Sequence, residues 1–403
     1  GVFVLSGKNF AWDAAGVYSA FASRLIAAGA ELAQAPHITQ GLKFDTEVHI
    51  VADDVIRFWQ SLNGSSGTGS YTTVATLVKQ VEANVLQIPY NYRSWTTAYL
   101  GGLNFACNYN YGVFRVNRLD ATPYLRIQSP GTAGFPTTPV LAITETNGRL
   151  LVLTETTIYW SGPNAPLNYV PALGGPGFIV ISERIGGKPF MVTSIAQGAI
   201  IWTTTGALVL EFIGGDSVFR VYPLATETLP LGGFAIAKLP DNTHVICTRL
   251  GLAQVEGVNQ PRTITPLFNE FLREYLRVRP KSEIHIFYSG NEHRIYVSIR
   301  QPDGAFSATY VLEIYLDRWG IFSSAHVGFF DYGIQRGQIA WADSNGIASH
   351  LLGPSQVSAG REISTAPGTY THLDSEILIG YIRAPELQAH GDVVQELQEI
   401  TVY

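Results

Sequence analysis

A short unit of two apolar strands joined by a tight Gly- or Asn-containing turn recurs along this chain. The units begin at residues 102, 148, 198, 243, 293 and 337, so successive starts lie 44 to 50 residues apart. A degenerate unit spans residues 48–59, with Asp53-Asp54 at its turn. Repeats of about 40–50 residues built from short strands are typical of β-propeller blades. The repeat therefore predicts an all-β fold, a six- or seven-bladed β-propeller.

The chain contains few charged residues. Only 14% of the 403 residues are charged, whereas 46% are hydrophobic, and a typical protein has about 25% charged residues. One interpretation is that partner proteins cover much of the surface; the other is an ordinary β-protein with an uncharged polar surface. The net charge of −6 argues against tight DNA binding, because neutralisation of phosphates drives such binding.

Segments at the two ends of the chain do not follow the repeat. We expect an N-terminal arm or strand over residues 1–45, the propeller over 46–362, and C-terminal strands packing outside it over 363–403. The N- and C-terminal segments are expected to form a small additional β-domain. Within the arm, the Ala-rich stretch Ser19–Ala33 is compatible with a helix or an extended strand.

One connection between units looks helical. In Thr265–Arg277, Thr265 can cap the helix and Pro266 suits its first turn. An apolar face follows at helical spacing, formed by Leu267, Phe268, Phe271, Leu272, Tyr275 and Leu276. Such a helix either packs on the propeller's own face or docks a neighbouring subunit.

The most basic stretch of the chain lies at the end of this helix. It contains Arg273, Arg277, Arg279 and Lys281. Cations at a helix C-terminus complement the helix dipole, so a solvated helix end is one interpretation. The other is a contact surface for an acidic partner or for DNA phosphates. We keep these four residues as candidate partner- or DNA-facing contacts.

A search for catalytic patterns returns nothing specific. The sequence holds no complete phosphate-binding loop and no nucleophile elbow. Asp53-Asp54 is the only pair of adjacent acidic residues in the sequence, and a turn explains it better than paired catalytic carboxylates. Cys107 and Cys247 occupy equivalent places in two repeats and are expected to be small buried hydrophobes without a zinc site. We therefore expect no enzyme activity, no cofactor, no metal and no membrane span.

Several short segments resemble the tail nozzle or hub proteins of short-tailed bacteriophages, including the packaged-DNA stabilisation type. The segments that carry this resemblance are Gly7–Asn9 with Ser19–Phe21, Gln260–Pro266, Tyr310–Trp319 and Ile379–Ile382. The resemblance implies a structural protein of the virion tail. In that family six copies form a ring below portal and adaptor proteins, enclose the DNA exit channel for ejection, and carry tail fibres, spikes or a needle.

The resemblance further implies that double-stranded DNA passes through without specific binding, which the mild acidity of the chain fits. Two other hypotheses remain. The first is a carbohydrate-binding or carbohydrate-cleaving propeller used in host attachment, with a cavity lined by Trp or Tyr and two convergent carboxylates. The second is a cellular protein-interaction propeller.

Overall fold

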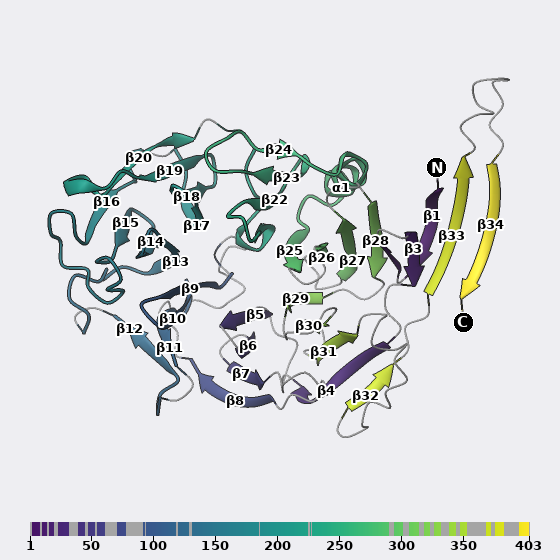
Figure 1. Ribbon diagram of the computed structural model, residues 1–403, viewed down its shortest axis with the longest axis horizontal. Coiled ribbons are helices and arrows are strands. Elements are labelled where there is room, and N and C mark those ends of the chain that lie inside the picture. Colours follow the sequence, from purple (N-terminus) through teal and green to yellow (C-terminus); the bar gives the residue numbers. More distant parts are fainter. Residues whose placement is uncertain are drawn as a thin grey trace.

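Antiparallel sheets of short strands make up most of the structure, a computed structural model (Figure 1). It describes strands between residues 2 and 402, residues 76–77 and 92, and residues 94–289 apart from 118–119, 129–130, 185, 225 and 227. Side chains are described at residues 42, 76–77 and 92, and over 94–288 with the same gaps. They are described again at 294–299, 309–312 and 319–320. The predicted all-β class and β-propeller fold are confirmed.

Among the described strands, six four-stranded antiparallel sheets follow one another. The first three are β5–β8 (Thr39–Phe44, Glu47–Ala52, Val55–Gln60, Tyr71–Thr76), β9–β12 (Thr96–Leu100, Leu103–Asn108, Gly112–Val116, Tyr124–Ile127) and β13–β16 (Val140–Thr146, Arg149–Thr154, Thr157–Trp160, Gly177–Val180). The next three are β17–β20 (Pro189–Ile195, Gly198–Thr203, Ala207–Phe212, Phe219–Leu224), β21–β24 (Ile236–Lys238, His244–Thr248, Gly251–Val255, Arg262–Thr263) and β25–β28 (Glu283–Ser289, Arg294–Arg300, Phe306–Glu313, Arg318–Phe322).

A five-stranded sheet completes the circle of sheets, which we call the wheel (Figure 1). Its strands lie in the order β29-β30-β31-β4-β32, with bounds His326–Asp331, Gln338–Asp343, Ile347–Leu352, Ser23–Glu31 and Gly368–Thr371. The first strand of this sheet, β29, contacts both β25 and β5. Figure 1 shows the first strands of the sheets nearest the middle of the wheel.

The repeated unit of the sequence forms the two middle strands of each four-stranded sheet of the wheel. The unit starting at 148 is the pair β14–β15, and the unit starting at 198 is the pair β18–β19. Every residue of β14 and β18 is buried, because a middle strand is covered on both faces by the neighbouring sheets. By contrast, the outermost strand β16 alternates between half-buried and exposed residues. The strongest sequence signal therefore marks the most deeply buried strands.

The wheel closes through a strand from the N-terminal part of the chain. Strand β4 lies within the Ala-rich stretch and pairs with β31, so this stretch is extended and not helical. Strand β32 then pairs with the other edge of β4. The wheel thus includes strands from both segments that we expected to lie outside it, 1–45 and 363–403. Closing a ring with such a strand removes exposed edges that would otherwise recruit other chains.

A separate sheet joins the two ends of the chain. Strand β33 (Ser375–Ile382) pairs with β1 (Val2–Lys8) on one side and with β34 (Gln395–Val402) on the other. This pairing of the N-terminal strand with the C-terminal strands agrees with the expected small β-domain. The hairpin β2–β3 (Phe10–Asp13, Gly16–Ser19) contacts β27 and β28. Figure 1 shows the terminal sheet beside β28, outside the wheel.

The predicted helix is confirmed as α1 (Pro266–Val278), which connects β24 to β25. Two details of the prediction are wrong. Thr265 makes no side-chain cap; its backbone is left-handed, with φ 49°, and its hydroxyl is buried. Leu267 lies outside the apolar face and is 65% exposed, because the buried stripe runs through its neighbour Phe268. Short 3-10 turns lie at Gly215–Ser217 and Gly233–Ala235.

Candidate functional site

Helix α1 packs on the wheel between two of its sheets. Phe268, Leu272 and Leu276 are buried in an apolar cluster that both β21–β24 and β25–β28 contribute to. The Phe268 ring centroid lies 5.4 Å from that of Tyr310 on β27 and 5.8 Å from that of Trp319 on β28. Of the two expected positions for the helix, the structure therefore places it on the propeller itself.

A buried amide fixes α1 to the neighbouring sheet. The Asn269 Oδ1 atom accepts a hydrogen bond of 2.6 Å from the Leu252 backbone N–H. Its Nδ2 group donates to the Leu252 carbonyl at 3.1 Å and to the Ile264 carbonyl at 2.5 Å. Strand β24 pairs with β23 only at Ala253 and Gln254. The Ile264 N–H, just after β24, still donates to the Leu252 carbonyl at 3.2 Å, so Asn269 adds the partner of the Leu252 N–H and a second donor to its carbonyl.

The four basic residues predicted as contacts all lie exposed at the end of α1 or just beyond it. Arg277 pairs with Glu274, one turn earlier in the helix, and these hydrogen bonds raise the pKa of Arg277. The Arg279 guanidinium lies 4.9 Å from the centroid of the Tyr275 ring. Arg273 and Lys281 have no ion-pair partner within the described part of the chain.

Two of the four predicted residues line a cavity of about 350 Å³, which we call the arginine pocket. Arg273 and Arg277 come from α1, and Arg249 comes from the turn between β22 and β23. The remaining lining residues are Leu231, Leu276, Pro280 and Ser282. Arg279 and Lys281 do not line it. Sequence reasoning missed Arg249 because it lies on a different element, 24 positions before Arg273.

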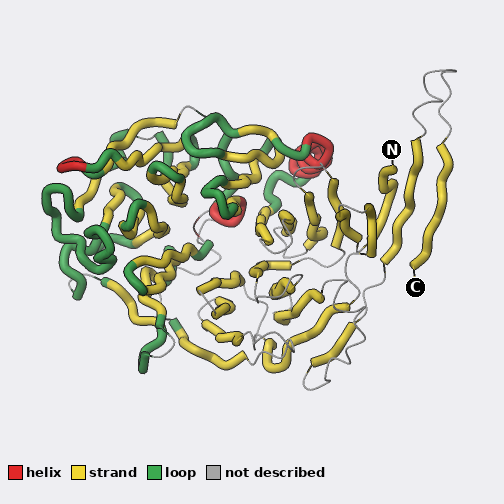
Figure 2. The backbone as a smooth tube through the Cα atoms, in the orientation of Figure 1, coloured by secondary structure: helices red, strands yellow, loops and turns green. Residues whose placement is uncertain are grey.

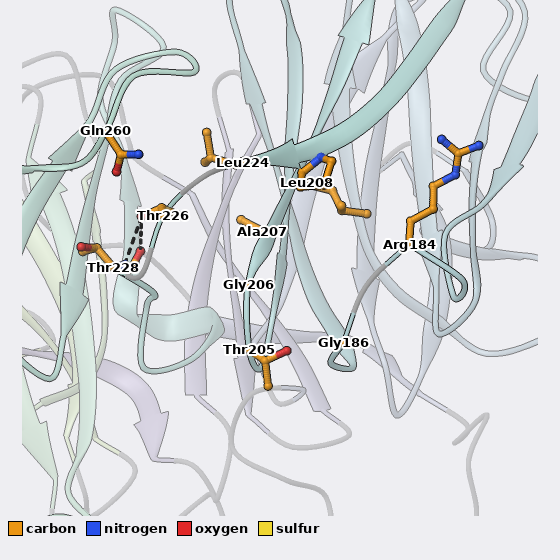
Figure 3. A pocket seen from close by; sticks show the side chains of 11 residues that line it. Arg184, Gly186, Thr205, Gly206, Ala207, Leu208, Leu224, Thr226, Thr228 and Gln260 are labelled. Carbon is orange, nitrogen blue, oxygen red and sulfur yellow. Dashed lines mark hydrogen bonds between the residues drawn. The ribbon is translucent and has the colours of Figure 1, made fainter.

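A wider groove of about 760 Å³ lies between the β17–β20 and β21–β24 sheets (Figure 3). Its wall is rich in hydroxyl and backbone groups, including Thr205, Thr226 and Thr228. Arg184 and Gln260 lie at opposite ends of the groove in Figure 3, and the Arg184 Nη1 group donates to the Val221 carbonyl at 3.1 Å. Among the residues that the structure describes, no Trp, Tyr, Asp or Glu lines this groove.

A small polar cluster connects the same two sheets. The Lys238 Nζ group donates a hydrogen bond of 2.7 Å to the Ser194 hydroxyl. Desolvation lowers the pKa of Lys238. Such a pair resembles the nucleophile and base of serine–lysine hydrolases, but Ser194 is only 4% exposed. A substrate cannot reach a hydroxyl buried to that extent, so we assign the pair to packing between sheets.

His244 lies next to this cluster and is fully buried. Burial and the nearby charge of Lys238 lower the pKa of His244 to about 4, with Asp241 opposing the shift. Among the described residues, neither ring nitrogen of His244 has a hydrogen-bond partner. The imidazole is therefore neutral at pH 7 and behaves as a core side chain.

The two cysteines do not form a disulfide. Cys107 and Cys247 are buried, as predicted, and both thiols are free. They lie on β10 and β22. Within the described part of the chain, no cluster of three or more His, Cys, Asp or Glu residues could hold a metal ion. No helix among the described residues is both long and apolar enough to cross a membrane. The Asp53-Asp54 turn lies outside the described residues.

Large apolar side chains are exposed around the edge strand β16, and we call this region the apolar rim. Its members are Leu173, Phe178, Val180, Phe212 and Ile213. Leu173 is 85% exposed, and the Gly174 N–H donates to the Asp216 carbonyl at 3.3 Å, which connects its loop to the turn after β19. Figure 2 shows these loops in green on that side of the wheel.

The loop that carries Leu173 is held from beneath by Arg149. The Arg149 guanidinium is buried and donates to the carbonyls of Ser161, Gly175 and Gly174 at 2.8, 3.0 and 2.8 Å. The Trp160 indole N–H donates to the Gly175 carbonyl as well, at 3.0 Å. Burial lowers the pKa of Arg149. The protein thus fixes a loop whose apolar tip faces solvent.

No family model matches the sequence, and no curated protein matches it. Solved structures resemble the wheel at low identity. Virginiamycin B lyase from Staphylococcus aureus is 13% identical, with a TM-score of 0.48, over 79% of this chain and 96% of that one. BamB from Moraxella catarrhalis is 11% identical, with a TM-score of 0.41, over 88% and 98%. The Cps50 (Swd1) β-propeller domain of Myceliophteria thermophila is 9% identical, with a TM-score of 0.44, over 78% and 96%.

The functions of these proteins differ, and similarity at this level carries no argument about the function of the chain. The class that the structure defines is therefore the β-propeller, and any function must be argued from the chain's own surfaces.

Proposed function

We propose that this chain is a structural virion protein of a short-tailed phage tail, one subunit of an oligomeric nozzle or hub. The proposal rests on one observation: the N-terminal strands and helix α1, which do not belong to the repeat, lie next to the same strand, β28. Strands β1 and β2 contact β28, and α1 packs against Trp319 on the same strand. Figure 1 shows the terminal sheet and α1 on this side of the wheel. Segments outside a repeat are free to evolve contacts without disturbing the blades.

Two different surfaces on opposite sides of the wheel support a ring of identical subunits. The terminal sheet ends in the edge strand β34, and the apolar rim surrounds the edge strand β16. These strands lie on opposite sides of the wheel in Figure 1. A ring of identical subunits needs two unlike surfaces that meet head to tail. The apolar rim would be covered by the next copy of this chain.

The remaining features of the role follow from the resemblance in sequence. The ring would contain six copies, continue the DNA exit channel below portal and adaptor proteins, and carry fibres, spikes or a needle. DNA would pass without specific binding, in keeping with the net charge of −6. In this role the chain is a component of the virion tail and is not an enzyme. We further propose that each sheet of the wheel is one blade, which makes seven.

Native mass spectrometry and electron microscopy of the purified protein test this proposal. We expect a ring-shaped oligomer that Leu173→Asp or Phe178→Asp converts toward monomers, because a charge in an apolar interface is costly to bury. Val258→Asp is the matched control, since Val258 is exposed outside the apolar rim. A wild-type protein that remains a monomer, alone and with portal and adaptor proteins, would contradict the proposal. Specific binding on a glycan array would favour the carbohydrate alternative instead.

A further inference from the structure

The arginine pocket is lined by three arginines that come from two elements. Arg249 is on the β22–β23 turn, and Arg273 and Arg277 are on α1. The two elements are held together by Asn269, whose amide bonds to Leu252 three residues after Arg249. The relative position of the two elements that form the cavity is therefore fixed by the hydrogen bonds between α1 and β23.

The charge in this pocket is only partly neutralised. Glu274 pairs with Arg277. Among the residues that the structure describes, neither Arg249 nor Arg273 has an ion-pair partner. Two like charges beside one cavity repel each other, and a bound anion removes that repulsion. The pocket therefore carries the positive charge of two unpaired guanidinium groups, although the net charge of the chain is negative.

The size and the other walls of the pocket restrict the anion. Leu231, Leu276 and Pro280 give the cavity an apolar side. Its volume of about 350 Å³ lies near the lower end of the range for small-molecule sites, about 300–1,000 Å³. An apolar wall next to paired positive charges suits a molecule with an anionic group at one end and a compact, weakly polar body.

We propose that the arginine pocket binds a small phosphomonoester, of about the size of a mononucleotide. A phosphate dianion matches the two unpaired guanidinium groups in charge, whereas a single carboxylate leaves one unneutralised. Guanidinium groups also match phosphate oxygens with paired, charge-assisted hydrogen bonds. The body of the ligand would lie on Leu231, Leu276 and Pro280. This site goes beyond the proposed role in a tail, and the evidence for the site does not depend on that role.

Isothermal titration calorimetry on the full chain tests the inference, with adenosine monophosphate as the probe. We expect saturable binding that Arg249→Gln and Arg273→Gln each weaken about 10-fold or more, as the loss of a charge-assisted hydrogen bond implies. Arg262→Gln is the matched control, because Arg262 is exposed on β24 outside the pocket. All three positions are exposed, and thermal unfolding of each variant checks that the fold is retained.

Further probes separate the phosphate from the rest of the ligand. Inorganic phosphate should compete with adenosine monophosphate, and adenosine without phosphate should bind at least 10-fold more weakly. The inference is overturned if the probe does not bind at millimolar concentration, or if Arg262→Gln weakens binding as much as the pocket variants. It is equally overturned if a dicarboxylate such as succinate binds more tightly than phosphate, or if only duplex DNA binds.

Discussion

The Asn269 side chain bonds to both backbone groups of Leu252, accepting from its N–H at 2.6 Å and donating to its carbonyl at 3.1 Å. The Leu252 carbonyl also accepts from the Ile264 N–H, whereas Asn269 is the partner of the Leu252 N–H. We expect Asn269→Ala to lower the free energy of unfolding by about 3 kcal/mol, because it leaves buried backbone groups without partners. Urea denaturation of this variant measures the effect.

The matched control for Asn269 is Asn259→Ala, at an exposed turn position. Its free energy of unfolding should change by less than about 0.5 kcal/mol. Equal effects of the two substitutions would show that the amide does not stabilise the junction of α1 with β23.

Gly251 lies against the same amide and cannot be replaced freely. Its φ is +117°, and a Cβ atom there would lie 2.3 Å from the Asn269 Cγ atom. We expect Gly251→Ala to destabilise the protein by more than about 3 kcal/mol, since backbone strain adds to the steric clash. Gly257→Ala separates the two effects: its φ is +57° and no atom lies within 4 Å of a Cβ. It should cost only about 1 kcal/mol, again in urea denaturation.

His244 should make the stability depend on pH. Its pKa in the folded protein is about 4, below the ordinary value of about 6.5. As the pH falls, the unfolded chain therefore takes up this proton first, and stability present above pH 6.5 is lost between pH 6.5 and pH 4. The loss attributable to His244 approaches about 3 kcal/mol at the acid end.

His244→Leu checks this expectation against the wild type. All other residues are the same in both proteins, so the difference in unfolding free energy between the two proteins isolates His244. As the pH is lowered from 7.5 to 4.5, the unfolding free energy of the variant should increase relative to that of the wild type. Parallel stability curves for the two proteins over this range would contradict the assignment.

Arg149 should fix the loop that presents Leu173. Arg149→Gln removes hydrogen bonds to the carbonyls of Ser161, Gly174 and Gly175. We expect a loss of about 2–4 kcal/mol in unfolding free energy and faster hydrogen exchange at Gly174 and Gly175. Arg220→Gln is the control, because Arg220 forms an exposed ion pair with Glu211, and such pairs contribute about 0–1 kcal/mol. Unchanged exchange in Arg149→Gln would rule out this role.

The sequence repeat predicted the β-propeller because its units are the most buried strands. Residues 150–153 of β14 and 199–202 of β18 are all apolar, since neighbouring sheets cover both faces of these strands. The outer strands carry little such signal: β24 has two residues, both exposed. The Ala-rich β4 has no strong preference of its own, and its extended form depends on pairing with β31. Pairing between distant segments cannot be read from local composition.

The candidate site was predictable only in part, for a similar reason. Arg273 and Arg277 stand out because four basic residues follow one another at the end of α1. Arg249 is a single arginine in a turn, and only the contact between Asn269 and Leu252 brings it to the same cavity. Thr265 shows the opposite error. A good capping residue in sequence adopts a left-handed backbone here and leaves the helix without a side-chain cap.

The pairing of β4 with β31 has a consequence for how the protein is made. During synthesis, residues 23–31 leave the ribosome long before residues 347–352, their partner in the last sheet. Until then β4 has neither of the strands that it pairs with, β31 and β32, and the sheet β5–β8 lacks its contact with β29. Contacts between such distant segments slow folding, and unpaired strand edges attract other chains. The interval before the last sheet is complete is thus the period in which a nascent chain is most exposed to misassembly.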